Sequence, residues 1–141
     1  MAKYKVSGLT EVKIDNAGGT LINLTSYIDT ISSFGKEVDS LDVTTFADSA
    51  ERIVAGIEKS QQFTISGPFD DTATTGPDAT LAPRVGSLGS FEIYPIGTVS
   101  GRRKISGEAL CISYKPAAAV KGRVEYEAVF KLDGASTIGT A

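Results

Sequence analysis

The residue types that most often carry catalysis or bind metals are scarce in this sequence. Cys111 is the only cysteine, and the 141 residues include no histidine. A thiolate nucleophile needs a neighbouring base, and a zinc site needs several nitrogen or sulfur ligands. Cys111 also lies in the apolar run 109–112, where a cysteine is typically a small buried side chain. We therefore predict that Cys111 belongs to the core and that the chain has no zinc site.

Two further groups of residues have the right types to hold an ion or a phosphate. Asp70 and Asp71 are adjacent, with Asp78 nearby, but a calcium ion takes six or more oxygen ligands from spaced positions. The glycine-rich stretches 86–89 and 97–101 lack the Gly-Lys-Ser/Thr ending of a phosphate-binding loop. We interpret the acidic pair as the start of a solvated loop and the glycines as turns. The sequence thus predicts no catalytic residue, no metal and no cofactor.

The charge balance argues against a protein that grips nucleic acid. The chain has 14 Lys and Arg against 17 Asp and Glu, for a formal net charge of −3. Phosphate binding needs clustered cations, and the only basic cluster is 102–104. We interpret that cluster as a solvated turn that leads into a strand, because a short basic run alone is a weak motif.

The residues are patterned for one β-rich domain. A chain of 141 residues, 15 of them glycine, suits many short strands joined by turns. Alternation of apolar and polar residues predicts strands over 60–66, 90–95, 104–114 and 123–132. Ile105 is out of phase with Leu110, and a bulge at Gly107 would restore the register. The last two strands should form a hairpin whose long loop covers 115–122.

The helical content should be small. The spacing of apolar residues predicts a helical turn over 24–28, and Asp78 is a possible N-cap of a second helix. Pro83 and Gly86 limit that helix to a turn or two. Together these patterns predict seven or eight strands in a β-sandwich or barrel with one short flanking helix.

The two ends of the chain carry weaker signals. Residues 1–9 lack the apolar core of a signal peptide, and no apolar stretch reaches the length that spans a bilayer. We therefore expect a protein made in a cytoplasm, without a membrane segment. Residues 135–141 are small and polar, which predicts a flexible C-terminal tail.

Segment 42–59 has two interpretations. Asp48 followed by Glu51 is a passable capping box, which favours one amphipathic helical turn over the domain's own core. β-branched residues on both sides and the helix-breaking Gly56 favour instead a long extended excursion. Such an excursion would expose an apolar patch, which generally marks an interface. The candidate contact residues are Thr45, Phe46, Asp48, Glu51, Arg52, Ile53, Val54 and Ile57.

An ordered set of short motifs resembles one known family. The run 42–46 (DVTTF), followed by Asp48 and Arg52, is similar to the stacking-loop signature of the tail tube proteins of long-tailed, siphovirus-type bacteriophages. Further segments that resemble the family follow in its order: 65–70 (ISGPFD), 91–95 (FEIYP) with Gly97, 105–109 (ISGEA) and 126–134 (YEAVFKLDG). The set covers about 21–134. Pro83 departs from the family pattern, because the flanking helix that usually precedes the Phe-Glu-Ile strand must here be short or displaced.

The resemblance implies a structural protein of the virion tail, assembled in the host cytoplasm. In that family six subunits form a ring, strands of neighbours join around a lumen, and rings stack through a long loop, here 42–59. The implied partners are further copies of the chain, the tape measure protein in the lumen, the tail terminator and the tail tip proteins. Double-stranded DNA would pass through the lumen without specific binding. Because six copies carry −18 formal charges, a lumen lined mostly with acids is expected.

Two other function classes compete with the tube subunit. A capsid decoration or adhesion domain would show the same strand pattern without a protruding interface at 42–59. A small enzyme is disfavoured because histidine and tryptophan are both absent, and with them a nucleophile–base pair and the usual aromatic platform of a glycoside hydrolase.

Overall fold

The computed structural model describes residues 10–32, 36–118, 120 and 122–141, so the prediction for residues 1–9 falls outside it. Nine strands and three short helical segments follow one another along this part of the chain. They are β1 (Glu11–Asp15), β2 (Leu21–Asn23), η1 (Thr25–Tyr27), β3 (Thr30–Ile31), β4 (Val38–Asp42), β5 (Ile53–Glu58), β6 (Gln62–Pro68), α1 (Pro77–Leu81), η2 (Ala82–Arg84), β7 (Leu88–Tyr94), β8 (Arg103–Ala117) and β9 (Glu125–Thr140).

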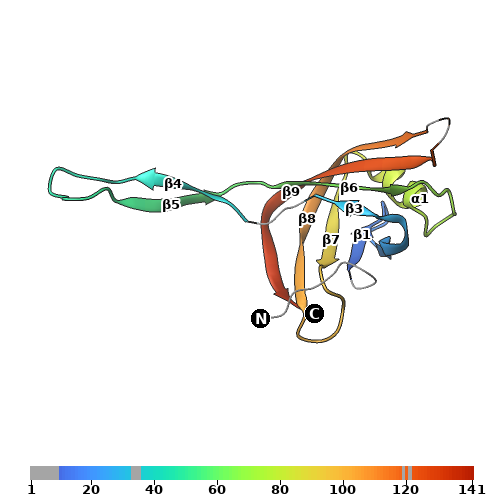
Figure 1. Ribbon diagram of the computed structural model, residues 1–141, viewed down its shortest axis with the longest axis horizontal. Helices are drawn as coiled ribbons and strands as arrows, with labels where there is room; N and C mark the ends of the chain where they lie inside the picture. The colour runs from blue at the N-terminus through green and yellow to red at the C-terminus, as the bar shows by residue number, and fades with distance from the viewer. Residues whose placement is uncertain (1–9, 33–35, 119, 121) are drawn as a thin grey trace.

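Seven of these strands form one antiparallel sheet. Its order is β2-β1-β7-β8-β9-β6-β3, so β8 and β9 lie at the centre and the two shortest strands at the edges. β4 and β5 form a separate two-stranded ribbon. Figure 1 shows this ribbon projecting from the body that the seven strands make.

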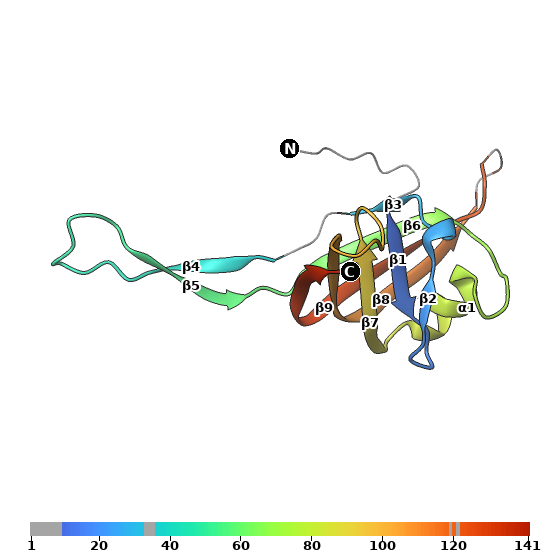
Figure 2. The ribbon, with the colours of Figure 1, turned by 90° about the horizontal axis from the view of Figure 1, so that it is seen from below.

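The sheet folds over on itself and encloses the core. β6 and β7 are separated in the sheet by β8 and β9, yet the rings of Phe63 and Phe91 pack with centroids 5.1 Å apart. The long central strands serve both halves of the fold (Figure 2). The β8–β9 register shifts at Gly107 and again at Ile112, and such bulges increase strand bending.

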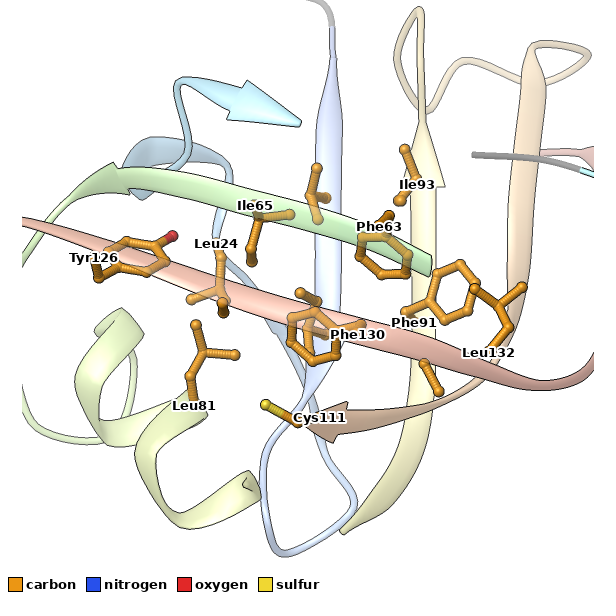
Figure 3. Packing of buried hydrophobic residues seen from close by; sticks show 14 residues of the cluster. Leu24, Phe63, Ile65, Leu81, Phe91, Ile93, Cys111, Tyr126, Phe130 and Leu132 are labelled. Atoms are coloured by element: carbon orange, nitrogen blue, oxygen red, sulfur yellow. The ribbon is translucent and has the colours of Figure 1, made fainter. Parts of the chain in front are cut away.

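The core lies between the two halves of the bent sheet. Apolar residues on alternating positions of β1, β6, β7, β8 and β9 meet there, together with Leu24 and with Leu81 of α1 (Figure 3). On β9 the buried residues are Tyr126, Ala128 and Phe130, as their alternation predicts, and Leu132 continues the series. Burying this set of side chains removes a continuous apolar surface from water and provides the main driving force for folding.

α1 and η2 attach to the body through a buried cation. Arg84 of η2 is 1% exposed and donates hydrogen bonds to the carbonyl oxygens of Asp15 and Ala109, both at 2.8 Å. Its guanidinium lies 5.6 Å from the centre of the Phe130 ring. Burial lowers the pKa of Arg84 from its ordinary value. One side chain thus connects the short helical segment to β1, β8 and β9.

Most local predictions are confirmed. The four predicted strands correspond to β6, β7, β8 and β9, the bulge lies at Gly107, and Cys111 is fully buried. The helical turn over 24–28 is the 3-10 segment η1. The second helix is a turn long, but its N-cap is Gly76 because Pro77 occupies the first turn. Asp78 instead accepts a hydrogen bond from the Tyr114 hydroxyl at 3.1 Å.

The predicted β fold with one short flanking helix is confirmed, and the structure corrects one other expectation. Of the sandwich and barrel alternatives, the closed barrel is excluded for the described residues, since their folded sheet has open edges at β2 and β3. Residues 135–140, which we predicted as a flexible tail, continue β9 instead, and 137–140 pair with β8 from Arg103 to Ser106. Ser136 is even buried at 2% exposed. Small side chains suggested a tail, but they are compatible with a strand here. The end of β9 is held by backbone pairing with the first residues of β8.

No helix among the described residues is long and apolar enough to cross a membrane.

Candidate assembly interface

The most conspicuous feature of the surface is the ribbon of β4 and β5, which with the loop between them we call the hairpin (36–59). It interrupts the connection between the paired strands β3 and β6 and extends away from the body in both views (Figures 1 and 2). At its base Lys59 donates its backbone N–H to the carbonyl of Glu37 at 2.6 Å. The Lys59 ammonium also pairs with Glu37 at 3.5 Å and Asp39 at 2.9 Å. The hairpin is therefore closed at its base.

The DVTTF segment organises the tip of the hairpin through its own polar groups. The carboxylate of Asp42 accepts the backbone N–H of Thr44 at 2.9 Å, and that of Asp48 accepts the N–H of Thr45 at 2.8 Å. The Thr44 hydroxyl accepts the N–H of Arg52 at 2.8 Å. These short-range bonds replace the helical turn that a capping box predicts.

The fold changes the ionisation of Asp42, where β4 meets the tip. Hydrogen bonds from the side chain and backbone of Thr44 lower the pKa of Asp42. The guanidinium of Arg52, by contrast, is largely exposed and lies 3.7 Å from the Asp48 carboxylate, a long ion pair in solvent. A pair of this kind contributes on the order of 0–1 kcal/mol, so Arg52 is free to meet a partner.

Apolar side chains cover the hairpin without a core beneath them. Phe46 at the tip is 112% exposed and Ile57 is 90% exposed. The remaining large apolar residues of the hairpin, also exposed, are Val38, Leu41, Val43, Ile53 and Val54. An isolated two-stranded hairpin is only marginally stable in water, and a contiguous exposed apolar surface generally marks an interface.

The structure therefore favours the extended interpretation of segment 42–59, and the helical-turn interpretation is wrong. All eight candidate residues lie on the hairpin: Thr45, Phe46, Asp48, Glu51 and Arg52 in the loop, and Ile53, Val54 and Ile57 on β5. Residues 45 and 48 hold the loop together, whereas Phe46 and the β5 side chains are presented to solvent.

Sequence reasoning missed the first strand of the hairpin as part of the site. Val38, Leu41 and Val43 add to the same exposed apolar surface. The available signal was the extended character of 38–46, since its apolar residues have no regular alternation that would anchor them to a core face.

The net charge of the chain is concentrated in the hairpin. Residues 36–59 include three cations against six carboxylates, which are Glu37, Asp39, Asp42, Asp48, Glu51 and Glu58. This difference of −3 equals the net charge of the whole chain, so the remaining 11 cations and 11 carboxylates balance. A surface that receives the hairpin consequently meets an acidic, apolar ribbon.

The part of the chain that the structure describes contains no cluster of three or more side chains suited to hold a metal ion. Asp70 bonds locally to the backbone and hydroxyl of Thr72, which is the loop role that the sequence predicts. Burial raises the pKa of the Cys111 thiol, and a thiol kept protonated is a poor nucleophile.

The fold can be compared with solved structures, although no protein-family model and no curated protein sequence matches the chain. The tail of an empty gene transfer agent particle, solved with C6 symmetry, has a chain that is 18% identical over 97% of this chain and 99% of its own, with a TM-score of 0.70. The SPP1 tail tube is 14% identical over 97% of this chain and 80% of its own, with a TM-score of 0.69.

A chain in the structure of the anti-feeding prophage tube-terminating cap also has a similar fold. It is 12% identical over 100% of this chain and 95% of its own, with a TM-score of 0.67. Because these likenesses extend over nearly the whole chain, from the folded sheet to the hairpin, this protein has the β fold of phage tail tube subunits.

Proposed function

We propose that this protein is the structural subunit of a tail tube, in which hexameric rings stack to form the conduit for DNA during ejection. The observation that carries the proposal is the exposed apolar hairpin on a body that has the tail tube fold. A hairpin with this surface in water is explained if another copy of the chain covers it. The six-fold symmetry of the similar gene transfer agent tail supports six copies in each ring.

The edges of the sheet provide the second contact that a ring needs. β2 and β3 each end the sheet with two or three residues, which leaves backbone groups available for pairing. Addition of a neighbour's strand at such an edge satisfies those groups and extends the sheet from one copy to the next. Lateral pairing through the edges would form the ring, and the hairpin would connect successive rings.

The partners follow from the tube. A tape measure protein would occupy the lumen before DNA does, a tail terminator would close one end, and tip proteins would close the other. A chain in the structure of the anti-feeding prophage tube-terminating cap has a similar fold, which supports recognition of a terminator through the same contacts. The protein would be located in the tail of the virion and would act without catalysis.

The acidity expected of the lumen depends on which carboxylates face the tube axis. Residues 10–32 and 60–141 have 9 cations against 11 carboxylates, so an acidic lumen requires either hairpin carboxylates near the tube axis or body carboxylates gathered on the surface that faces it. A tube reconstruction with a strongly basic lumen would contradict that prediction.

Negative-stain electron microscopy over a concentration series tests the proposed function. We expect hollow filaments with a regular axial repeat, and no filaments from a variant in which an Asn-Gly turn replaces residues 38–58. That variant should fold, because none of the buried core residues lies in the hairpin. The two residues that flank the replacement, Glu37 and Lys59, are already joined by a backbone hydrogen bond, so a short turn can connect them. Val99→Ser, in an exposed turn of the body, is the matched control and should still form filaments.

Compact particles at every concentration, even with tape measure protein added, would overturn the proposal. A defined small oligomer in that experiment would favour a capsid decoration or adhesion domain instead.

A further inference from the structure

The hairpin has exposed apolar side chains on both of its faces. Leu41 lies opposite Val54 in the β4–β5 register, and Val43 follows two residues later on the same face. A side chain added at Gly56 would touch Leu41, which places Gly56 on this face too. We call it the Leu41 face.

The opposite face is apolar as well. Ile53 lies opposite Asp42, and Ala55 lies opposite Ser40, so alternation places these four residues on the other side of the ribbon from Leu41. A shallow depression at the stem of the ribbon is lined by Val38, Asp39, Ser40, Ile53, Val54 and Ala55, so residues of both faces contribute to it. We call the side opposite Leu41 the Ile53 face, and its exposed apolar residues are Val38 and Ile53, the latter 62% exposed.

The sequence of β5 is itself that of a strand covered on two sides. Residues 53–57 read Ile-Val-Ala-Gly-Ile, a continuous apolar run. A strand with one solvated face alternates apolar and polar residues, whereas a strand buried on both faces is apolar throughout. In the single chain neither face of β5 is covered, because residues 53–55 and 57 are all exposed.

Charge decides what kind of surface can cover these faces. The hairpin has the full net charge of −3, so two hairpins packed against each other would repel. The rest of the chain has equal numbers of cations and carboxylates, so a hairpin packed against it meets no net repulsion. The cover is therefore the body of another copy and not its hairpin. A contact between two different surfaces of the same chain propagates from copy to copy, as a growing tube requires.

We infer that each hairpin is inserted between the bodies of two adjacent copies, one of which covers the Leu41 face and the other the Ile53 face. The inference rests on the proposed tube, in which ring neighbours lie side by side. The two faces of the flat hairpin point in opposite directions. The outer surface of one body can therefore contact only one of them, and covering both faces takes two bodies. The complete binding site thus exists only where two copies meet, so each hairpin ties together two subunits of the next ring.

Two single substitutions separate two-sided from one-sided docking. Val54→Thr changes the Leu41 face and Ile53→Thr the Ile53 face, and both keep a β-branched residue that suits a strand. A hydroxyl buried without a partner weakens packing, so each variant should raise the critical concentration for filaments by about tenfold to a hundredfold. Val99→Thr, in the exposed turn before β8, is the matched control and should leave it unchanged.

Cross-linking identifies the neighbours directly. A photoreactive amino acid at position 54 or at position 53 of the full chain is irradiated in assembled protein, and the joined peptides are sequenced. We expect the two positions to join different peptides of the body, and a chain with both groups to give covalent trimers. Joined hairpin peptides, or a cross-link and an assembly defect at one face alone, would overturn the inference.

The same samples separate this inference from the proposed function. If filaments form but one face shows neither a cross-link nor an assembly defect, the proposed tube stands and two-sided insertion is refuted. Compact particles whose two faces both cross-link to bodies would support insertion and refute the tube.

Discussion

Phe63 of β6 and Phe91 of β7 pack with ring centroids 5.1 Å apart, although two strands separate β6 from β7 in the sheet. This contact exists only because the sheet folds over, so the packing of these two rings depends on the bend of the sheet. Phe63 also stacks on Phe130 of β9 at 5.2 Å, which places it at the centre of the core (Figure 3).

Phe63→Ala should lower the free energy of unfolding by about 3–5 kcal/mol, because it removes a fully buried ring and leaves a cavity. Phe46→Ala is the matched control: the same change at the exposed hairpin tip should alter stability by less than about 0.5 kcal/mol. Urea denaturation of both monomers measures the difference. Equal losses would mean that the hairpin tip packs on the body, contrary to the structure.

Gly67 of β6 should tolerate no side chain. A Cβ there would lie 2.0 Å from the carbonyl oxygen of Tyr27, the same oxygen that accepts the Tyr126 hydroxyl at 2.8 Å. Gly67→Ala should therefore destabilise the body by about 1–3 kcal/mol or more, because the backbone of η1 must move. Gly139→Ala on β9, where nothing lies within 4 Å, is the control. Thermal unfolding of the two variants tests this, and a Gly67→Ala midpoint equal to that of the control would contradict it.

Much of the body could be predicted from the sequence. Residues such as Phe63, Tyr126 and Phe130 alternate with polar neighbours, so their strands and buried faces follow from local pattern. The contact between Phe63 and Phe91 does not follow, because it depends on how far a seven-stranded sheet bends. The bulge at Ile112, which contributes to the bend, has no glycine to signal it.

The wrongly predicted tail and the strand left out of the predicted interface have a common physical cause. Residues 135–140 and the β4 strand of the hairpin have too few alternating apolar side chains to indicate burial. Both are strands because their backbones pair with an adjacent strand, Arg103–Ser106 in one case and β5 in the other. Pairing of this kind satisfies hydrogen bonds without needing a side-chain pattern. The sequence therefore predicted a tail at 135–140, and it predicted extended backbone over 38–46 without placing that segment in the interface.

Arg52→Glu should impair ring stacking and leave folding intact. Arg52 is the only cation in the hairpin loop, it is largely exposed, and its weak pair with Asp48 contributes little to stability. Reversal of its charge makes the tip more acidic and should raise the critical concentration for filaments by about tenfold or more. Arg103→Glu at the start of β8 is the control for a charge reversal outside the hairpin. Full-length tubes from Arg52→Glu at the wild-type concentration would remove this loop from the stacking contact.

The pKa of Asp42 should respond to a single hydroxyl. Thr44 lowers this pKa through hydrogen bonds to the carboxylate, so Thr44→Val should raise it. A lowered pKa means that the ionised carboxylate stabilises the tip above its ordinary pKa, and that this contribution is lost as the pH falls through the folded value. NMR titration of the Asp42 carboxyl carbon in the monomer measures the change.

An analogous carboxylate provides the control for that titration. Thr72 lowers the pKa of Asp70 by the same two kinds of hydrogen bond, in a loop of the body. Thr72→Val should raise the pKa of Asp70 and leave that of Asp42 unchanged. An Asp42 pKa that does not respond to Thr44→Val would show that the tip lacks this bond in solution.

The separation of the hairpin from the buried core has a consequence for how such a protein can evolve. Because no core residue lies between Lys36 and Lys59, substitutions and length changes in the hairpin should have little effect on the stability of the body. Selection on partner choice can then act on one segment while selection on foldability acts on another. Two lineages with interchangeable bodies could become mutually incompatible through a handful of hairpin mutations, without either passing through an unstable intermediate.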